Sequence, residues 1–221
     1  MDLFTAMHGR RSVRAYLTHP VGRDTIEAVL EAARWAPSGV NMQPWDVAVV
    51  SGTTKARLAE AILAARAAGE AERPDYVYYP AQWHEPYKSR RRASGLAMYA
   101  ALGIGRDDQA RRTEAWNANY RFFGAPVGLL FFLDRRLGRG AWLDLGMFMQ
   151  NLMLTAEGHG LATCPQASMA DYPDLVRSVL GRSDDALLVA GMALGYPDPD
   201  APVNGYRTER EPVEAFAHFY E

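Results

Sequence analysis

The chain has 221 residues, and 24 basic against 26 acidic side chains give a formal net charge of −2. Its hydrophobic share of 48% is typical of a soluble globular protein and excludes an intrinsically disordered or collagen-like chain. The near balance of charge argues against a dedicated duplex-DNA-binding protein, which normally carries a basic excess.

The N-terminal third is predicted to alternate helices with one strand. Residues up to Tyr16 are expected to form a short helix that runs into a turn. Residues 21–33 have apolar side chains at helical spacing, and Asp24 and Glu27 could form a capping box at the start of this helix. A strand over 45–50 and an Ala-rich helix over 55–68 follow.

The composition changes near Gly69. Residues 73–92 place tyrosines and tryptophan among three prolines, which prevent a regular helix, and end in the basic run Lys88 to Arg92. We interpret that run as a solvated face. Helical patterning resumes over 93–102 and 107–119. We interpret 70–123 as an insertion or lid over the active site, because its apolar content is too low for a core of its own.

The C-terminal half contains the most apolar segments. Residues 125–133 are predicted to be a strand buried on both faces. Residues 141–159 are predicted to be a helix that is apolar nearly all round, as in a core or a subunit interface. The other predicted elements are a strand that ends at Pro165, a helix over 172–180, a strand over 187–194 and a final helix over 212–219.

This order of elements predicts an α+β fold of three α/β/α layers, with a mixed central sheet flanked by helices. The whole chain, 1–221, is expected to form a single domain. No apolar run approaches the ~20 residues that a membrane helix needs, and the N-terminus lacks the order of a secretory signal. A cytoplasmic location, without a membrane or nucleic-acid partner, is therefore expected.

Several kinds of site are excluded or unsupported. The single cysteine, Cys164, cannot form an internal disulfide and is expected to be a small buried hydrophobe rather than a nucleophile. The five histidines lack metal-ligand spacing, so no metal is expected. Neither a glycine-rich nucleotide loop nor a G-x-S-x-G elbow is present, and no acid–base pair stands out. These absences point to a cofactor that carries the chemistry itself.

Four polar segments could bind such a cofactor: residues 10–14, 36–45, 164–168 and 204–212. Arginines offer paired donors to oxyanions, so the first and last segments could together hold a phosphate if they meet in space. The loop 36–45 is suited to hydrogen-bonding a polar ring, and 164–168 could present backbone N–H groups to a ligand. Taken singly, a solvated basic turn and an ordinary connecting loop remain open alternatives.

In order and spacing, these segments resemble the motifs of the FMN-dependent nitroreductase family. The matching motifs are Arg-Arg-Ser-Val-Arg at 10–14, Ala-Pro-Ser-Gly-x-Asn-x-Gln-Pro-Trp at 36–45, Gly-Leu-x-Thr-x-Pro at 160–165, and Gly-Tyr-Pro at 195–197 before Arg-x-Pro at 210–212. The resemblance covers almost the whole chain apart from 70–123. The aromatic stretch and residues 122–127 are more similar to a nitrobenzoate-reductase-like subgroup.

The resemblance implies a domain-interlocked homodimer whose two FMN sites are shared between subunits. Arg10 would hold the phosphate, Arg14 would stabilise the reduced flavin at its pyrimidine edge, and a backbone N–H near Ala167 would face flavin N5. Pro37, Ser38, Gly39 and Asn41 would come from the partner. The implied cofactor-binding residues are Arg10, Arg11, Ser12, Arg14, Pro37, Ser38, Gly39, Asn41, Pro165, Gln166, Ala167, Arg207 and Arg210. Gln166-Ala167-Ser168 departs from the Glu-Gly pair of some relatives, which leaves the specificity of that wall open.

The implied activity is NAD(P)H-dependent reduction of nitroaromatic compounds to hydroxylamino products by two-electron steps, in a ping-pong cycle with a small aromatic substrate. No catalytic side chain is implied, since FMN carries the chemistry. Two alternatives stay open. The same FMN scaffold could perform dehydrogenation, reductive dehalogenation or flavin cleavage, or the chain could be a non-catalytic flavin-binding module.

Overall fold

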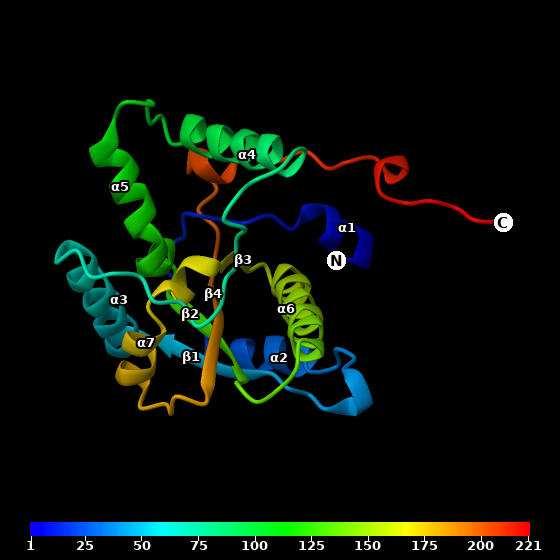
Figure 1. The fold of residues 1–221 in the computed structure, drawn as a ribbon, viewed down its shortest axis with the longest axis horizontal. Helices are drawn as coiled ribbons and strands as arrows, with labels where there is room; N and C mark the ends of the chain where they lie inside the picture. Colours follow the sequence, from blue (N-terminus) through cyan, green and yellow to red (C-terminus); the bar gives the residue numbers. More distant parts are fainter.

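Two apolar runs form the centre of the sheet. The computed structural model describes all 221 residues, and in it β2 (Val127–Asp134) and β4 (Ala186–Gly195) pair antiparallel. β1 (Asp46–Ser51) pairs with β2, and β3 (Ala162–Gln166) pairs with β4, so the strand order is β1-β2-β4-β3 (Figure 1). All of β2 except its last residue is buried, which requires cover on both faces of the sheet.

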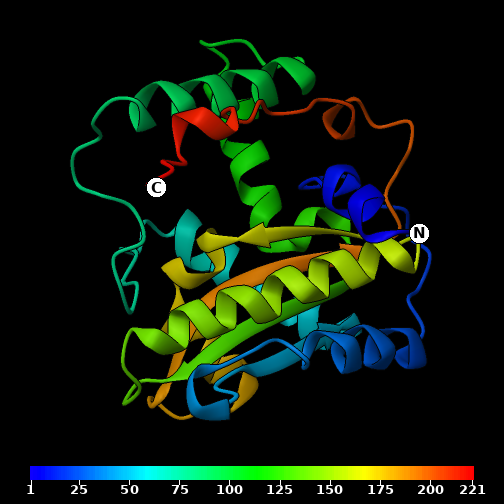
Figure 2. The same ribbon diagram turned by 90° about the vertical axis from the view of Figure 1, so that its right-hand side faces the viewer.

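Helices supply that cover in two layers. α2 (Arg23–Ala33) and α6 (Gly140–Gly158) pack on one face, where Leu129 and Phe131 of β2 belong to their core (Figure 2). α3 (Gly52–Ala67) and α7 (Pro173–Leu180) belong to the core on the other face, with Leu130 and Phe132. Because successive strand residues point to opposite faces, β2 serves both cores. The predicted α+β class with three layers is confirmed.

The sheet itself is antiparallel throughout rather than mixed. Its one parallel contact is an isolated bridge between Ser12 and Thr163, which joins the N-terminal segment to β3. α1 (Leu3–Gly9) precedes that segment. None of the helices combines the length and apolarity needed to cross a membrane.

Two local expectations were wrong. The N-cap of α2 is Gly22 rather than Asp24, and Glu27 pairs with Arg23 across 2.7 Å on the helix surface instead of closing a capping box. The C-terminal segment contains only a 3-10 turn, Val213–Ala215, instead of a helix over 212–219. Phe216 and Phe219 are exposed there, so no apolar contact stabilises a short helix.

The segment 70–123 leaves the body of the fold and returns. It contains α4 (Tyr87–Ala101) and α5 (Gln109–Asn117), which stand apart from the sheet (Figure 1), and neither helix has a buried residue. α4 begins earlier than predicted and includes the basic run 88–92. Two of those arginines have partners: Arg90 pairs with Glu211 at 2.9 Å, and Arg91 lies 4.9 Å from the Trp83 ring centre.

Before α4, this segment is fastened to the body. The Tyr76 hydroxyl donates to the Val189 carbonyl of β4 at 2.6 Å, and its ring meets Trp142 of α6 edge-on, with ring centres 4.5 Å apart. Beside it, Asp75 accepts hydrogen bonds from Arg177 and Arg135. Asp75 and Tyr76 therefore fasten the aromatic, proline-rich stretch to the body.

Candidate functional site

The first and last arginine groups of the chain meet in one basic cavity of about 490 Å³. The N-terminal segment reaches it because the Val13 N–H donates to the Thr163 carbonyl (3.0 Å) and the Leu17 N–H to the Tyr196 carbonyl (2.9 Å). The predicted cofactor-binding residues that line this cavity are Arg10, Arg11, Ser12, Arg14, Arg207 and Arg210.

These arginines are not equivalent as anion donors. Arg207 donates to the carbonyls of His8 and Gly9 at the end of α1, and Arg210 donates to the carbonyls of Thr208 and Glu209. The Arg10 and Arg11 side chains form no hydrogen bond or ion pair within the chain. A pair of guanidiniums without partners in the chain, beside two that are hydrogen-bonded, could hold a doubly charged oxyanion.

Arg14 is shared by this cavity and a second one. Its backbone N–H donates to the buried Asn204 side chain at 2.9 Å, and its Nη1 donates to the Tyr206 hydroxyl at 2.7 Å. Asn204 also donates to the Ala15 carbonyl at 2.8 Å, so the late segment clamps the early one. Residues almost two hundred positions apart thus hold one guanidinium at the junction of the two cavities.

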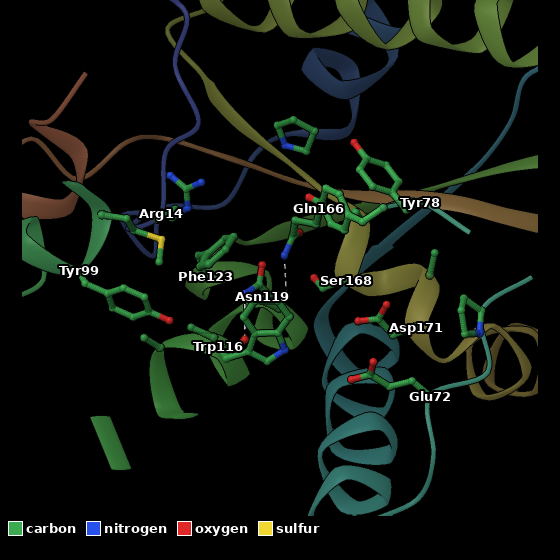
Figure 3. Close-up of a pocket in the computed structure, with 18 of the residues that line it drawn as sticks. Arg14, Glu72, Tyr78, Tyr99, Trp116, Asn119, Phe123, Gln166, Ser168 and Asp171 are labelled. Atoms are coloured by element: carbon green, nitrogen blue, oxygen red, sulfur yellow. Dashed lines mark hydrogen bonds between the residues drawn. The ribbon is translucent and has the colours of Figure 1, made fainter. Parts of the chain in front are cut away.

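The second cavity has about 610 Å³ and a largely apolar wall (Figure 3). Pro165, Gln166 and Ala167, where β3 ends, line it together with Arg14. Aromatic side chains of the 70–123 segment supply much of the remaining wall: Tyr76, Tyr78, Tyr79, Tyr99, Trp116 and Phe123. A flat aromatic ring would find stacking surfaces here and a positive charge at one end.

A strained turn places Phe123 at this junction. Phe122 and Phe123 have φ values of 53° and 54°, a left-handed conformation that is uncommon for bulky side chains. Phe122 is fully buried against β2, where a Cβ at Gly128 would lie 2.5 Å from its ring. Phe123 faces the cavity, with the Arg14 guanidinium 6.0 Å from its ring centre. Backbone strain of this kind is typical of functional sites.

The end of the cavity away from Arg14 is acidic. Asp171 accepts a hydrogen bond from the Tyr120 hydroxyl at 3.1 Å, and Glu72 lies beside it on the cavity wall (Figure 3). Burial, reinforced by the negative charge of Glu72, raises the pKa of Asp171 to about 6, although the Tyr120 hydrogen bond and Arg66 oppose the shift. This carboxyl group is therefore ionised at neutral pH but titrates in an accessible range.

The predicted loop residues lie elsewhere. Pro37, Ser38, Gly39 and Asn41 line neither cavity. The Gly39 N–H donates to Asp144 of α6 at 3.2 Å, which ties the loop to the body. The loop carries three residues of positive φ, Val40, Asn41 and Gln43, and the Val40 side chain is fully exposed.

Some residues that line the apolar cavity gave no sequence signal. Glu72, Tyr99, Trp116, Asn119 and Asp171 line the apolar cavity, but they come from widely separated segments, and only the aromatic richness of 73–92 hinted at such a wall. Cys164 is 2% exposed within the core, and burial raises the pKa of its thiol, as expected for a structural cysteine.

The fold places a basic cavity beside an aromatic one, an arrangement that suits a flat aromatic ligand with an attached anionic group. The Nitroreductase family model matches residues 7–196, and the chain belongs to the nitroreductase family. It is 38% identical to a 4-nitrobenzoate reductase of Pseudomonas putida, over 99% of this chain and 95% of the relative.

Further likenesses cover nearly the full length. The chain is 39% identical to a nitrobenzene nitroreductase of Ectopseudomonas oleovorans, over 95% of this chain and 93% of the relative. Its structure is similar to that of the FMN-dependent nitroreductase NfnB from Mycobacterium smegmatis in complex with NADPH, with a TM-score of 0.93, 38% identity and full coverage of both chains.

Proposed function

We propose that this chain is an FMN-dependent nitroreductase that uses NAD(P)H to reduce nitroaromatic compounds. The observation that carries the proposal is the junction at Arg14, which joins a basic cavity to an aromatic one. In each turnover a nitro compound takes up two electrons and two protons to give a nitroso compound and water, while NAD(P)H and a proton supply them. A second such step gives the hydroxylamine.

The residues present fit FMN. Arg10 and Arg11, with Arg207 and Arg210 beside them, would hold the phosphate in the basic cavity, and Ser12 would add a hydroxyl. Pro165, Gln166 and Ala167 would lie against the ring system in the apolar cavity. When bound, FMN supplies the transfer of electron pairs between the two substrates.

The side chains of this chain position the reaction. Asn204 holds the backbone N–H of Arg14, and Tyr206 accepts from its guanidinium. A guanidinium fixed in this way stabilises negative charge that develops on a ring beside it, which is the role we assign to Arg14. The lid formed by 70–123 supplies aromatic surfaces for the substrate and limits water access. The backbone N–H near Ala167 would face the reactive edge of the ring.

We propose further that the active unit is a homodimer with shared sites. The loop of Pro37, Ser38, Gly39 and Asn41 lies outside the cavities of its own chain and presents a fully exposed Val40. α6 exposes Leu143 and Met147, and the C-terminal tail exposes Phe219 as it extends from the body (Figure 1). Exposed apolar surface of this kind is typical of subunit interfaces.

The activity is tested with the purified protein. We expect a yellow protein whose flavin absorbance bleaches under NADPH or NADH without oxygen and returns when nitrobenzene is added. A colourless protein that FMN cannot reconstitute would contradict the cofactor. Flavin that is reduced but never reoxidised by any nitro compound would contradict the substrate class.

The shared site is tested by mixing two defective chains. Arg10→Ala damages the phosphate side, and the double variant Ser38→Ala/Asn41→Ala damages the loop. In a mixed dimer one site carries both defects and the other carries none, so random co-refolding in equal amounts should restore about 25% of wild-type activity. Each variant refolded alone is the control. Activity of the mixture that never exceeds the mean of the two controls would contradict sharing.

A further inference from the structure

The apolar cavity is polarised along its length. Arg14 is the only basic side chain on its wall, whereas Glu72 and Asp171 lie together at the other end (Figure 3). Arg66, which is outside the wall, pairs with Glu72 at 3.3 Å and offsets one of the two negative charges. Asp171 has no cationic partner, and its Oδ1 accepts no hydrogen bond within the chain.

Two buried polar groups on the wall of this cavity also lack partners. Ser168 is 8% exposed and lines the cavity next to Asp171 (Figure 3), yet its hydroxyl has no hydrogen-bond partner. Gln166 is 3% exposed; its Nε2 donates to the Asn119 carbonyl at 2.6 Å, but its Oε1 has no partner. Buried polar groups are normally hydrogen-bonded, so unpaired ones on a cavity wall point to a polar ligand.

Together these groups define the chemistry of that ligand. Glu72 and Asp171 present carboxylate oxygens that accept hydrogen bonds, and the Ser168 hydroxyl beside Asp171 can accept as well. A substituent that donates several hydrogen bonds and carries positive charge satisfies all of them, whereas a carboxylate would face two negative charges in a partly desolvated site.

We propose that the Glu72–Asp171 end of the cavity selects nitroaromatic substrates that carry an ammonium or amino substituent and disfavours those that carry a carboxylate. This inference rests on the proposed function. It distinguishes the chain's preference from that expected for a nitrobenzoate reductase, which the similarity to such a relative would otherwise suggest.

The test compares three substrates of similar size: 4-nitrobenzylamine, 4-nitrobenzyl alcohol and 4-nitrobenzoate. At pH 7.5 we expect kcat/KM for the amine to exceed that for the benzoate by about tenfold or more, mainly through a lower KM for the amine. The reason is that opposite charges in contact attract strongly in a partly buried site. In the double variant Glu72→Gln/Asp171→Asn the ratio should fall towards one. Glu60→Gln, an exposed change on α3 outside the cavity, should leave it unaltered.

The neutral alcohol separates two kinds of failure. No reduction of the alcohol would contradict the proposed function itself. Reduction of the alcohol with equal kcat/KM for amine and benzoate, or with a ratio that the double variant leaves unchanged, would overturn the charge preference alone. If the double variant does not retain flavin absorbance, Asp171→Asn alone, which keeps an acceptor for Tyr120, provides the comparison.

The pH dependence of the amine-to-benzoate ratio of kcat/KM provides a second test of the role of Asp171. Burial and Glu72 raise the pKa of Asp171 to about 6, so protonation of this group should weaken the preference for the amine as the pH falls through 6. The other ionisable groups near Asp171 are Glu72, Arg66, Tyr120, Tyr76 and Tyr79. Burial raises the pKa of each of the three tyrosines, so they stay neutral in this range. A ratio that is constant between pH 5 and pH 8 would contradict the role of Asp171.

Discussion

Replacing Arg10 with alanine is expected to weaken FMN binding by about 10- to 100-fold. A charge-assisted hydrogen bond contributes about 1.5–3 kcal/mol, and each 1.4 kcal/mol changes a Kd tenfold. Arg10 lines the basic cavity and forms no hydrogen bond within the chain, so its donors are available to a phosphate. Arg207, in contrast, is occupied by the carbonyls of His8 and Gly9.

The Kd for FMN is measured by titrating FMN with the apoprotein and recording the quenching of flavin fluorescence. Arg23→Ala is the matched control, because its side chain is 88% exposed on α2 and lines neither cavity. Its Kd for FMN should equal that of the wild type. Unchanged FMN affinity in Arg10→Ala would contradict the phosphate assignment. Riboflavin, which has no phosphate, should bind wild type and Arg10→Ala alike.

The largest loss of stability is expected for Asp75→Ala, which should lower the free energy of unfolding by about 3 kcal/mol. The Asp75 carboxylate accepts hydrogen bonds from Arg177 and Arg135, each at 2.6 Å, and from the Leu188 N–H at 3.3 Å. Both Asp75 and Arg177 side chains are less than 10% exposed. Removing the carboxylate leaves a buried guanidinium with a weaker set of partners and removes one of the contacts that fasten the segment leading to the lid.

Asp174→Ala is the matched control. Asp174 also pairs with Arg177, but its side chain is 72% exposed, so its loss should cost less than about 1 kcal/mol. Denaturant unfolding of both variants with saturating FMN at pH 7 provides the comparison. Equal effects of the two substitutions would show that burial does not set the strength of this network.

The pKa of Asp75 determines how the stability contributed by this network changes with pH. Burial alone would raise the pKa of its carboxyl group, but hydrogen bonds from Arg177 and Arg135 outweigh burial and hold the pKa below its ordinary value of 3.8. Its contribution to stability is therefore present above pH 3.8 and is lost as the pH falls through the lowered pKa. The stability difference between wild type and Asp75→Ala should accordingly shrink in acid.

The elements that could be predicted are those whose burial produces a recognisable pattern of apolar residues in the local sequence. The continuous apolar run of β2 and the helical spacing of apolar residues in α2 were sufficient to predict these two elements, because buried strands and buried helix faces leave different patterns in the sequence. The helix expected near the C-terminus failed because propensity without packing does not hold a short helix. Asp24 and Glu27 fit a capping box, but the chain reaches α2 through Gly22 instead.

Half of the site was also predictable. Arg10, Arg14 and Arg210 fall in motifs, and the structure brings them to one cavity. The acidic end was not predictable, since Glu72 and Asp171 are remote in sequence and become neighbours only through the return of the 70–123 segment. The loop of Ser38 and Asn41 lines neither cavity of its own chain, so its place in the site stays a prediction.

The lack of buried residues in α4 and α5 has a consequence for how this enzyme can be altered. The wall made by β3 and Arg14 is joined directly to the folded core, because Ala162 and Cys164 of β3 belong to that core and the buried Asn204 holds the Arg14 N–H. Substitutions there are therefore expected to change cofactor binding and stability together. Tyr99 and Trp116 line the same cavity from helices that contribute nothing to that core. The evolution of new substrate ranges therefore has an open route through the lid, where mutations change what is recognised at little risk to folding.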